Sequence, residues 1–322
     1  MNRPHLLIPW VQAYQANLEP SPQPKQPIIR DNWQSALGDK ERIGDWTTFF
    51  QRELGQAPWS AVIKDWIPRL APGLAGSAGY GILRAARAIH NLALAESEPG
   101  KTGLAESLGY WAARFLKLPG ILGSVTAGSF APIEALAHIK WQYKDQPPRF
   151  ENVMVGLQGL SRFSPFAGVI NLVKIPEKHL ELLAQTTEAM ARVFLSNSYD
   201  PGKHIPFILA IAVPSALRYI IPHFDPEYQP TLLRYGWQFA GAMYAIYGRA
   251  NPSESWESPS ENREQLIDQA ISTQNEHAII CTEACLREYT THPHPVYLAA
   301  AWEAVRLLAS ASQDESSGND HT

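Results

Sequence analysis

Three residues near the C-terminus have side chains that bind metals or transfer protons. His277, Cys281 and Cys285 follow one another at intervals of four, so on an α-helix they lie on one side. His277 and Cys285 would stand roughly 12 Å apart along the helix axis, too far for one tetrahedral site. The cysteines therefore either belong to a site completed by other elements or are small buried apolar residues, which is the commoner role of free cysteine.

Two further pairs of polar residues each have a functional and an ordinary interpretation. His292 and His294 lie in the turn between two expected helices, where they either hold a metal or are solvated loop residues. Tyr80 and Arg84 are four residues apart on an expected helix and so share a side. They either face a pocket together or reflect a common surface ion pair or snorkelling arginine.

A glycine-rich segment at 73–81 precedes that helix. It either presents a helix N-terminus to an anion or forms a tight loop that lets two helices approach each other. The chain contains no Gly-x-Gly-x-x-Gly after a strand and no P-loop, so the dinucleotide and nucleoside triphosphate signatures are absent.

The elements that must position these residues are expected to be helices, because apolar residues recur in them with helical spacing. Asp45 is expected to cap the first helix, and the residues 98–101 (Glu-Pro-Gly-Lys) to end the second. The residues 118–132 are expected to be irregular, and the proline-rich segments 19–27 and 146–149 to be extended connectors. Helices are expected at 45–54, 77–94, 102–117, 178–196, 204–221, 230–247, 264–289 and 295–310.

No run alternates with period two for long enough to predict a sheet, and no repeat has a fixed period. The chain is therefore expected to be all-α, with proline-punctuated helices around an aromatic-rich core. We expect an N-terminal segment with a proline-rich connector at 1–30, a single large helical domain at 31–312 and a disordered tail at 313–322.

The composition of the 322 residues limits the partners. Hydrophobic residues make up 45%, enough for a sizeable core, and the net charge of −4 offers no basic surplus for nucleic acid. The N-terminus does not resemble a signal peptide, and the longest apolar run, at 205–213, is too short for a membrane helix. We expect a cytoplasmic protein that binds neither nucleic acid nor membrane.

Six segments together resemble the questin oxidase-like family, and they span nearly the whole chain. Trp-Thr-Thr-Phe-Phe lies at 46–50, Gly-Tyr-Gly-Ile-Leu-Arg at 79–84 and Pro-Ser-Ala-Leu-Arg at 214–218. Arg-Tyr-Gly-Trp-Gln lies at 234–238, and longer similar runs lie at 276–289 and 293–301. The resemblance implies a mostly helical oxidoreductase of secondary metabolism that acts on aromatic polyketides, such as anthraquinones, by oxygen insertion or ring cleavage. It also implies a polar site built from histidines and a lysine, suited to non-haem iron.

This chain departs from the family pattern at most of those polar positions. Tyr80 replaces the histidine of a His-Gly-Leu-Ile-Arg motif, and Asn32 follows Asp31 where the family has Asn-His. Leu209 replaces a second motif histidine, and Ile280 replaces the lysine of His-Ala-Ile-Lys. His277 is retained, but one imidazole cannot hold iron, so we expect this chain to lack the metal.

The resemblance then leads to an enzyme that keeps an aromatic-substrate pocket and works without iron. His277 is its expected general acid or base, and Tyr80 and Asn32 form hydrogen bonds to a phenol or quinone oxygen. Arg84 stabilises developing negative charge, while Leu209 and Ile280 contact the substrate.

Two other hypotheses stay open. One is a catalytically degenerate homologue that binds a small aromatic ligand or a partner protein. The other keeps a metal, with His277, Cys281 and ligands from elsewhere. The sequence does not decide the substrate, any reductant or the oligomeric state.

Overall fold

The structure is a computed structural model that describes residues 8, 22–123, 128–143, 149, 152–252, 254–256 and 262–317. Within these residues helix is the only regular structure, apart from two isolated bridges that pair Leu74 with Leu116 and Phe130 with Val173. The prediction of an all-α chain is confirmed.

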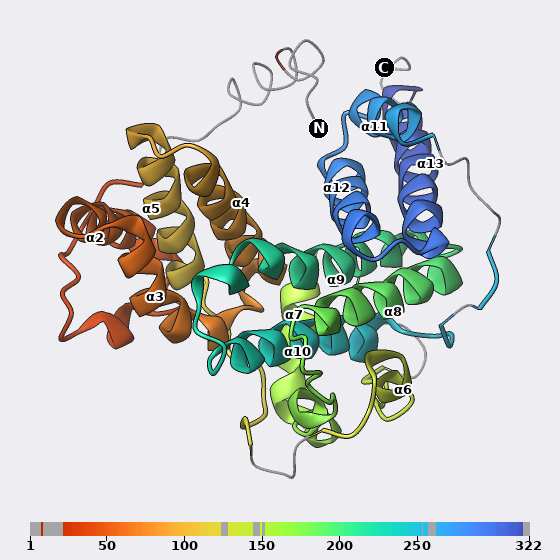
Figure 1. Cartoon of the computed structure of the whole chain (residues 1–322), viewed down its shortest axis with the longest axis horizontal. Helices are drawn as coiled ribbons and strands as arrows, with labels where there is room; N and C mark the ends of the chain where they lie inside the picture. Colours follow the sequence, from red (N-terminus) through yellow and green to blue (C-terminus); the bar gives the residue numbers. More distant parts are fainter. Residues whose placement is uncertain are drawn as a thin grey trace.

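The helices form three groups along the chain (Figure 1). The N-terminal group holds α2 (Ile43–Gln56), α3 (Trp59–Leu70), α4 (Tyr80–Leu94) and α5 (Glu98–Ala113). The middle group holds the short α6 (Pro132–Leu136) and α7 (Val153–Gly159) and the long α8 (Glu181–Asn197), α9 (His204–Ala216) and α10 (Gln229–Tyr247). The C-terminal group holds α11 (Arg263–Ser272), α12 (Glu276–Thr291) and α13 (Pro295–Ser317).

Helix α9 joins these groups into one domain. It is apolar on every side, and it packs against α8, α10, α12 and α4. The helical stretch Pro201–His223 is long and apolar enough to cross a membrane by composition, but 78% of its apolar window is buried inside the protein. Its hydrophobicity is thus matched by contacts with other helices, as in a core helix.

The aromatic-rich core expected from the composition is densest in the N-terminal group. The rings of Trp46, Phe49 and Phe50 surround Trp66, with centroids 4.8–6.1 Å from the Trp66 ring. These contacts are mostly edge-to-face, a geometry worth about 0.5–1.5 kcal/mol per pair beyond area burial. They hold α2 against α3, and both of these helices pack against α5.

Several local predictions are wrong. Helix α2 begins at Ile43, and the buried Asp45 carboxylate instead accepts backbone N–H groups of Lys25 and Gln26, which ties down the extended segment before it. The residues 98–101 begin α5 rather than separate two helices: the hydroxyl of Ser97 accepts the Gly100 N–H at 3.2 Å. Proline is tolerated there because N–H groups of a first turn have no intrahelical acceptor.

Two further boundaries differ from expectation. Helix α3 falls in a part of the chain for which no helix was expected. The expected helix at 264–289 is two helices, broken where Gln274 takes a left-handed φ of 54°.

The expected connectors and tail are described only in part. Residues 22–28 contain no helix, in line with a connector, whereas residues 144–148 lie outside the described part. The expected tail starts within α13, which reaches Ser317, and residues 318–322 lie outside the described part.

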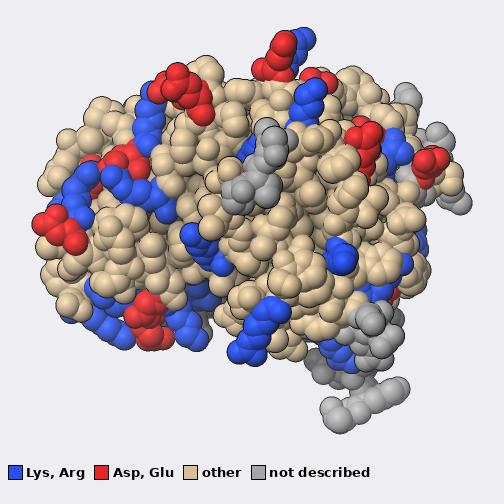
Figure 2. All heavy atoms as spheres, turned by 90° about the horizontal axis from the view of Figure 1, so that it is seen from below, with Lys and Arg blue, Asp and Glu red and all other residues tan. Residues whose placement is uncertain are grey.

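On the face drawn in Figure 2, uncharged residues predominate, and Lys and Arg lie at separate points among them.

The glycine-rich loop before α4 supports the tight-loop interpretation. Ser77, Ala78 and Gly79 are all left-handed, which turns the chain sharply into α4. A Cβ on Gly76 would lie 1.8 Å from the Arg114 carbonyl oxygen, and one on Gly81 would lie 2.8 Å from Cβ of Trp111. The glycines therefore let α4 lie directly against α5, and this contact positions Tyr80.

Candidate functional site

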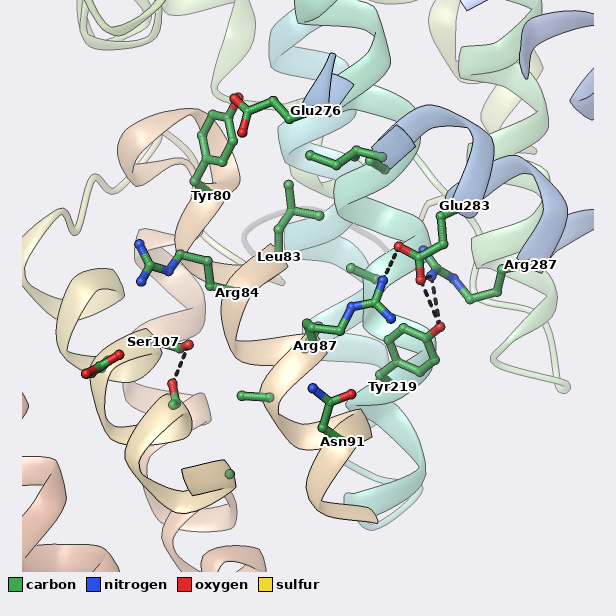
Figure 3. A pocket seen from close by; sticks show the side chains of 18 of the residues that line it. Tyr80, Leu83, Arg84, Arg87, Asn91, Ser107, Tyr219, Glu276, Glu283 and Arg287 are labelled. Carbon is green, nitrogen blue, oxygen red and sulfur yellow. Dashed lines mark hydrogen bonds and ion pairs between the residues drawn. The ribbon is translucent and has the colours of Figure 1, made fainter. Parts of the chain in front are cut away.

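A cleft of about 650 Å³ lies between the N-terminal and C-terminal helix groups (Figure 3). Helices α4 and α5 form one wall, α12 forms the other, and α9 lies at the bottom. Leu83, Ala212, Ala216 and Ile280 give the middle of the cleft an apolar lining. Its volume falls within the range of pockets that hold small organic molecules.

At one end of the cleft, the side chains of Tyr80 and His277 form a hydrogen bond of 2.6 Å between Oη and Nε2. Tyr80 is the first residue of α4, directly after the left-handed Gly79. His277 lies in the first turn of α12, where Asn275 caps the helix by accepting the His277 backbone N–H at 2.9 Å. Two helix starts thus fix the pair from opposite walls.

The surroundings favour the neutral form of both groups. Burial raises the pKa of Tyr80, and the negative charge of Glu276 raises it further, so the phenol keeps its proton. Burial lowers the pKa of His277, although Glu276 partly opposes this effect. At neutral pH the imidazole therefore has a free lone pair that accepts a proton, and the phenol keeps a proton that it can donate.

A second polar cluster lies at the other end of the cleft, about two helical turns away. Arg87 from α4 and Arg287 from α12 both contact the carboxylate of Glu283, the latter at 3.3 Å. Arg287 also donates to the hydroxyl of Tyr219 at 3.1 Å, and the Tyr219 ring stacks on His90 with centroids 4.1 Å apart. Figure 3 shows Arg87, Tyr219, Glu283 and Arg287 gathered on one side of Leu83, with Tyr80 on the other.

Buried charges hold this second cluster from behind. Glu288 is fully buried and accepts two bonds from Arg218, at 2.7 and 2.6 Å, and one from the hydroxyl of Ser215 at 2.7 Å. The same Ser215 hydroxyl accepts from Nε of Arg287 at 3.1 Å. These bonds connect the end of α9 to α12, so the base of the cleft and one of its walls are fastened together.

Of the six predicted site residues, three line the cleft and a fourth is hydrogen-bonded to one of these three. Tyr80, Arg84 and Ile280 line it, and His277 contacts Tyr80. The guanidinium of Arg84, however, lies over the ring of Tyr110 of α5, with 4.8 Å to the centroid. It points away from α12 in Figure 3, whereas Arg87 points toward that helix.

The other two predicted site residues do not line the cleft. Leu209 is completely buried in α9. Asn32 is exposed in the N-terminal group, where its side-chain oxygen accepts the backbone N–H of Ile29 at 3.0 Å. The side-chain amide oxygen of Asn32 thus stabilises a local turn.

The remaining histidine and cysteine pairs have structural surroundings. Cys281 and Cys285 are fully buried, and their mutual hydrogen bond, followed by burial, raises the pKa of the Cys285 thiol. His292 is exposed, whereas His294 directly precedes α13, and its Nδ1 accepts the backbone N–H of Val296 at 3.2 Å. Neither pair belongs to a metal site, because no group of three or more His, Cys, Asp or Glu in the described residues is arranged to hold a metal ion.

The residues present do not fit a non-haem iron. Nε2 of His277 lies at hydrogen-bonding distance from the Tyr80 hydroxyl, and Leu209 and Ile280 carry no donor atom. Iron needs several nitrogen or oxygen ligands with an open position.

The second polar cluster was missed by sequence reasoning. Arg87 follows Tyr80 by seven positions and so lies near the same face of α4, and on α12 the same spacing separates Glu283 from Glu276, the neighbour of His277. That shared spacing was the available signal. It becomes informative only once α4 and α12 are known to face each other.

Together, the fold and the cleft define an all-α protein with a cleft between its N-terminal and C-terminal helices. A family model described as Questin oxidase-like matches residues 10–90, so this part of the chain is similar to that family. The match includes Tyr80 and Arg87 but not α12 with His277. It suggests an oxidoreductase-type function. A search of curated proteins finds no match.

Proposed function

We propose that this protein is an oxidoreductase that acts on an aromatic polyketide-type phenol or quinone in the cleft, without a resident iron. The observation that carries the proposal is the Tyr80–His277 hydrogen bond at one end of an apolar cleft. A phenol or quinone has an apolar ring for the middle of such a cleft and an oxygen for the polar pair. The oxidoreductase-type function suggested by the family match agrees with this chemistry.

The first step is removal of the substrate's hydroxyl proton. The substrate hydroxyl donates to Oη of Tyr80 while the Tyr80 proton moves to Nε2 of His277, so the charge ends on the imidazole. The lowered pKa of His277 keeps this acceptor neutral before the reaction. The product of the step is an electron-rich phenolate held between the apolar side chains of Leu83 and Ile280.

Dioxygen from solvent is the oxidant in the second step. A ring carbon of the phenolate forms a bond to one oxygen atom while the π bond of dioxygen breaks. The imidazolium of His277 then returns its proton through Tyr80 to the terminal oxygen. The substrate loses two electrons, dioxygen is reduced to the peroxide level, and the resulting hydroperoxide is set up for ring opening.

The test is oxygen consumption with a panel of hydroxylated anthraquinones and benzophenones, followed by product analysis. Tyr80→Phe and His277→Gln are expected to reduce kcat at least about 100-fold, the usual contribution of a positioned acid or base. Tyr199→Phe is the matched control, because Tyr199 is 70% exposed and is not among the residues that line the cleft. Turnover is expected to continue in EDTA.

Two outcomes would contradict the proposal. Equal rates for Tyr80→Phe and the unaltered protein would remove the pair from the mechanism. Tight binding of the panel without any oxygen consumption would favour the alternative function, a homologue that binds an aromatic ligand and performs no chemistry.

A further inference from the structure

The second polar cluster carries a surplus of positive charge that the proton-transfer pair does not use. Arg87 and Arg287 share a single carboxylate, that of Glu283, because Glu288 is already matched by Arg218. Two guanidinium groups and one carboxylate leave one positive charge at this end of the cleft.

The positive charge affects a neighbouring group and leaves donors for a ligand. Burial has the largest effect on the pKa of His90 and lowers it; the positive charges of Arg87 and Arg287 lower it further, and the carboxylate of Glu283 opposes them. Arg287 uses Nε and Nη1 in its bonds to Ser215, Tyr219 and Glu283, which leaves Nη2 as a donor. Arg87 is half-exposed at the cleft surface, so its guanidinium is accessible to a ligand.

We infer that this end of the cleft binds a carboxylate of the substrate, so the substrate is an aromatic acid with a phenol or quinone oxygen at its opposite end. Guanidinium groups bind carboxylates through paired, charge-assisted hydrogen bonds. One surplus charge matches a monoanion such as a carboxylate. The inference rests on the proposed function for the position of the phenol, but the anion site itself does not depend on any reaction.

The helix geometry sets the length of this ligand. Contacts pair Tyr80 with His277 and Arg87 with Glu283, so α4 and α12 run in the same direction across the cleft. The seven residues from Tyr80 to Arg87 correspond to a rise of about 10 Å. That length suits two or three fused six-membered rings with one polar substituent at each end, seated on Leu83 and Ile280 between them.

The experiment compares 6-hydroxy-2-naphthoic acid with its methyl ester, which differ in charge at one end only. Binding to the full chain is measured by the change in naphthalene fluorescence. The acid is expected to bind the unaltered protein more tightly than the ester. Arg87→Gln is expected to lower the affinity for the acid roughly 10-fold or more, which corresponds to the loss of one charge-assisted hydrogen bond. The affinity for the ester is expected to stay nearly the same.

The matched control is Arg306→Gln, because Arg306 is 66% exposed, pairs with Glu303 and is not among the residues that line the cleft. It is expected to bind both probes as the unaltered protein does. Arg287→Gln provides a second test from the opposite wall, with circular dichroism to confirm that it folds. Equal affinities for acid and ester, an equal loss of both in Arg87→Gln, or no binding of either at millimolar concentration would each overturn the inference.

The failure of the proposed function would look different. If the acid binds in an Arg87-dependent way and no compound supports oxygen consumption, the anion site stands and the oxidation does not. If neutral phenols are oxidised through Tyr80 and the acid has no advantage over the ester, the oxidation stands and the anion site does not.

Discussion

The buried ion pair of Glu288 and Arg218 permits a quantitative prediction about stability. Glu288 is fully buried, and the Arg218 side chain is only 10% exposed. Replacing Glu288 with Gln keeps the size of the side chain but turns one of its two oxygens into an NH₂ group. Arg218 donates to both oxygens, so one of its donors would then face another donor.

The cost follows from what remains buried after the change. The guanidinium of Arg218 keeps its charge but loses the carboxylate that compensates it. Removing one partner of a buried pair costs about 3–5 kcal/mol. We expect the free energy of unfolding of Glu288→Gln to fall by an amount in the lower part of this range, because the remaining amide oxygen still accepts one bond.

The assay is urea unfolding followed by tryptophan fluorescence, with equal m-values as the condition for comparison. Glu41→Gln is the control, because Glu41 is 67% exposed and contacts Lys25 at 3.3 Å, and it is expected to cost no more than about 0.5 kcal/mol. A double variant, Glu288→Leu with Arg218→Met, is expected to recover most of the loss, since it leaves no buried charge. If Glu288→Gln stays within about 1 kcal/mol of the unaltered protein, the assigned role of the pair is wrong.

Three further outcomes follow from the structure. Gly81→Ala forces a Cβ against the facing helix at 2.8 Å, so thermal unfolding is expected to reveal a loss of about 1–3 kcal/mol; Gly55→Ala, with open space around it, should show none. Arg87→Gln removes a charge that lowers the pKa of His90, so NMR titration should find that pKa raised. An unchanged pKa would contradict the assigned charge effect of Arg87. Because burial lowers the pKa of His277, the unfolded chain takes up a proton first as pH falls below about 6.5, and the free energy of unfolding should decline there. His277→Gln should show a shallower decline, and an identical pH profile would argue against a buried neutral imidazole.

The fold class was predictable because helical periodicity is a local property. The failures have local causes too. Helix α3 contains Pro68 near its end, which obscured its pattern, and no glycine or proline marks the break at Gln274. Asp45 has the residue type of a helix cap, but long-range bonds to the extended N-terminal segment use its carboxylate instead.

The candidate site was predictable only in part, because its members come from distant elements. Tyr80 and His277 were chosen from a resemblance, and only the folded chain shows that they share a hydrogen bond. Asn32 was assigned to the substrate by the same route, yet its side chain closes a turn elsewhere. Arg84 and Arg87 are equally plausible from spacing, and only the position of Tyr110 shows which of the two turns away from α12.

The hydrogen bond between Tyr80 and His277 joins residues 197 positions apart, which affects the order of events during synthesis. A ribosome must add all 197 of these residues after Tyr80 before the two side chains can meet. Products of premature termination before α12 therefore contain Tyr80 but lack His277. Closing so long a loop is entropically unfavourable, so the dyad is expected to assemble late in folding, after the local helix pairs have formed.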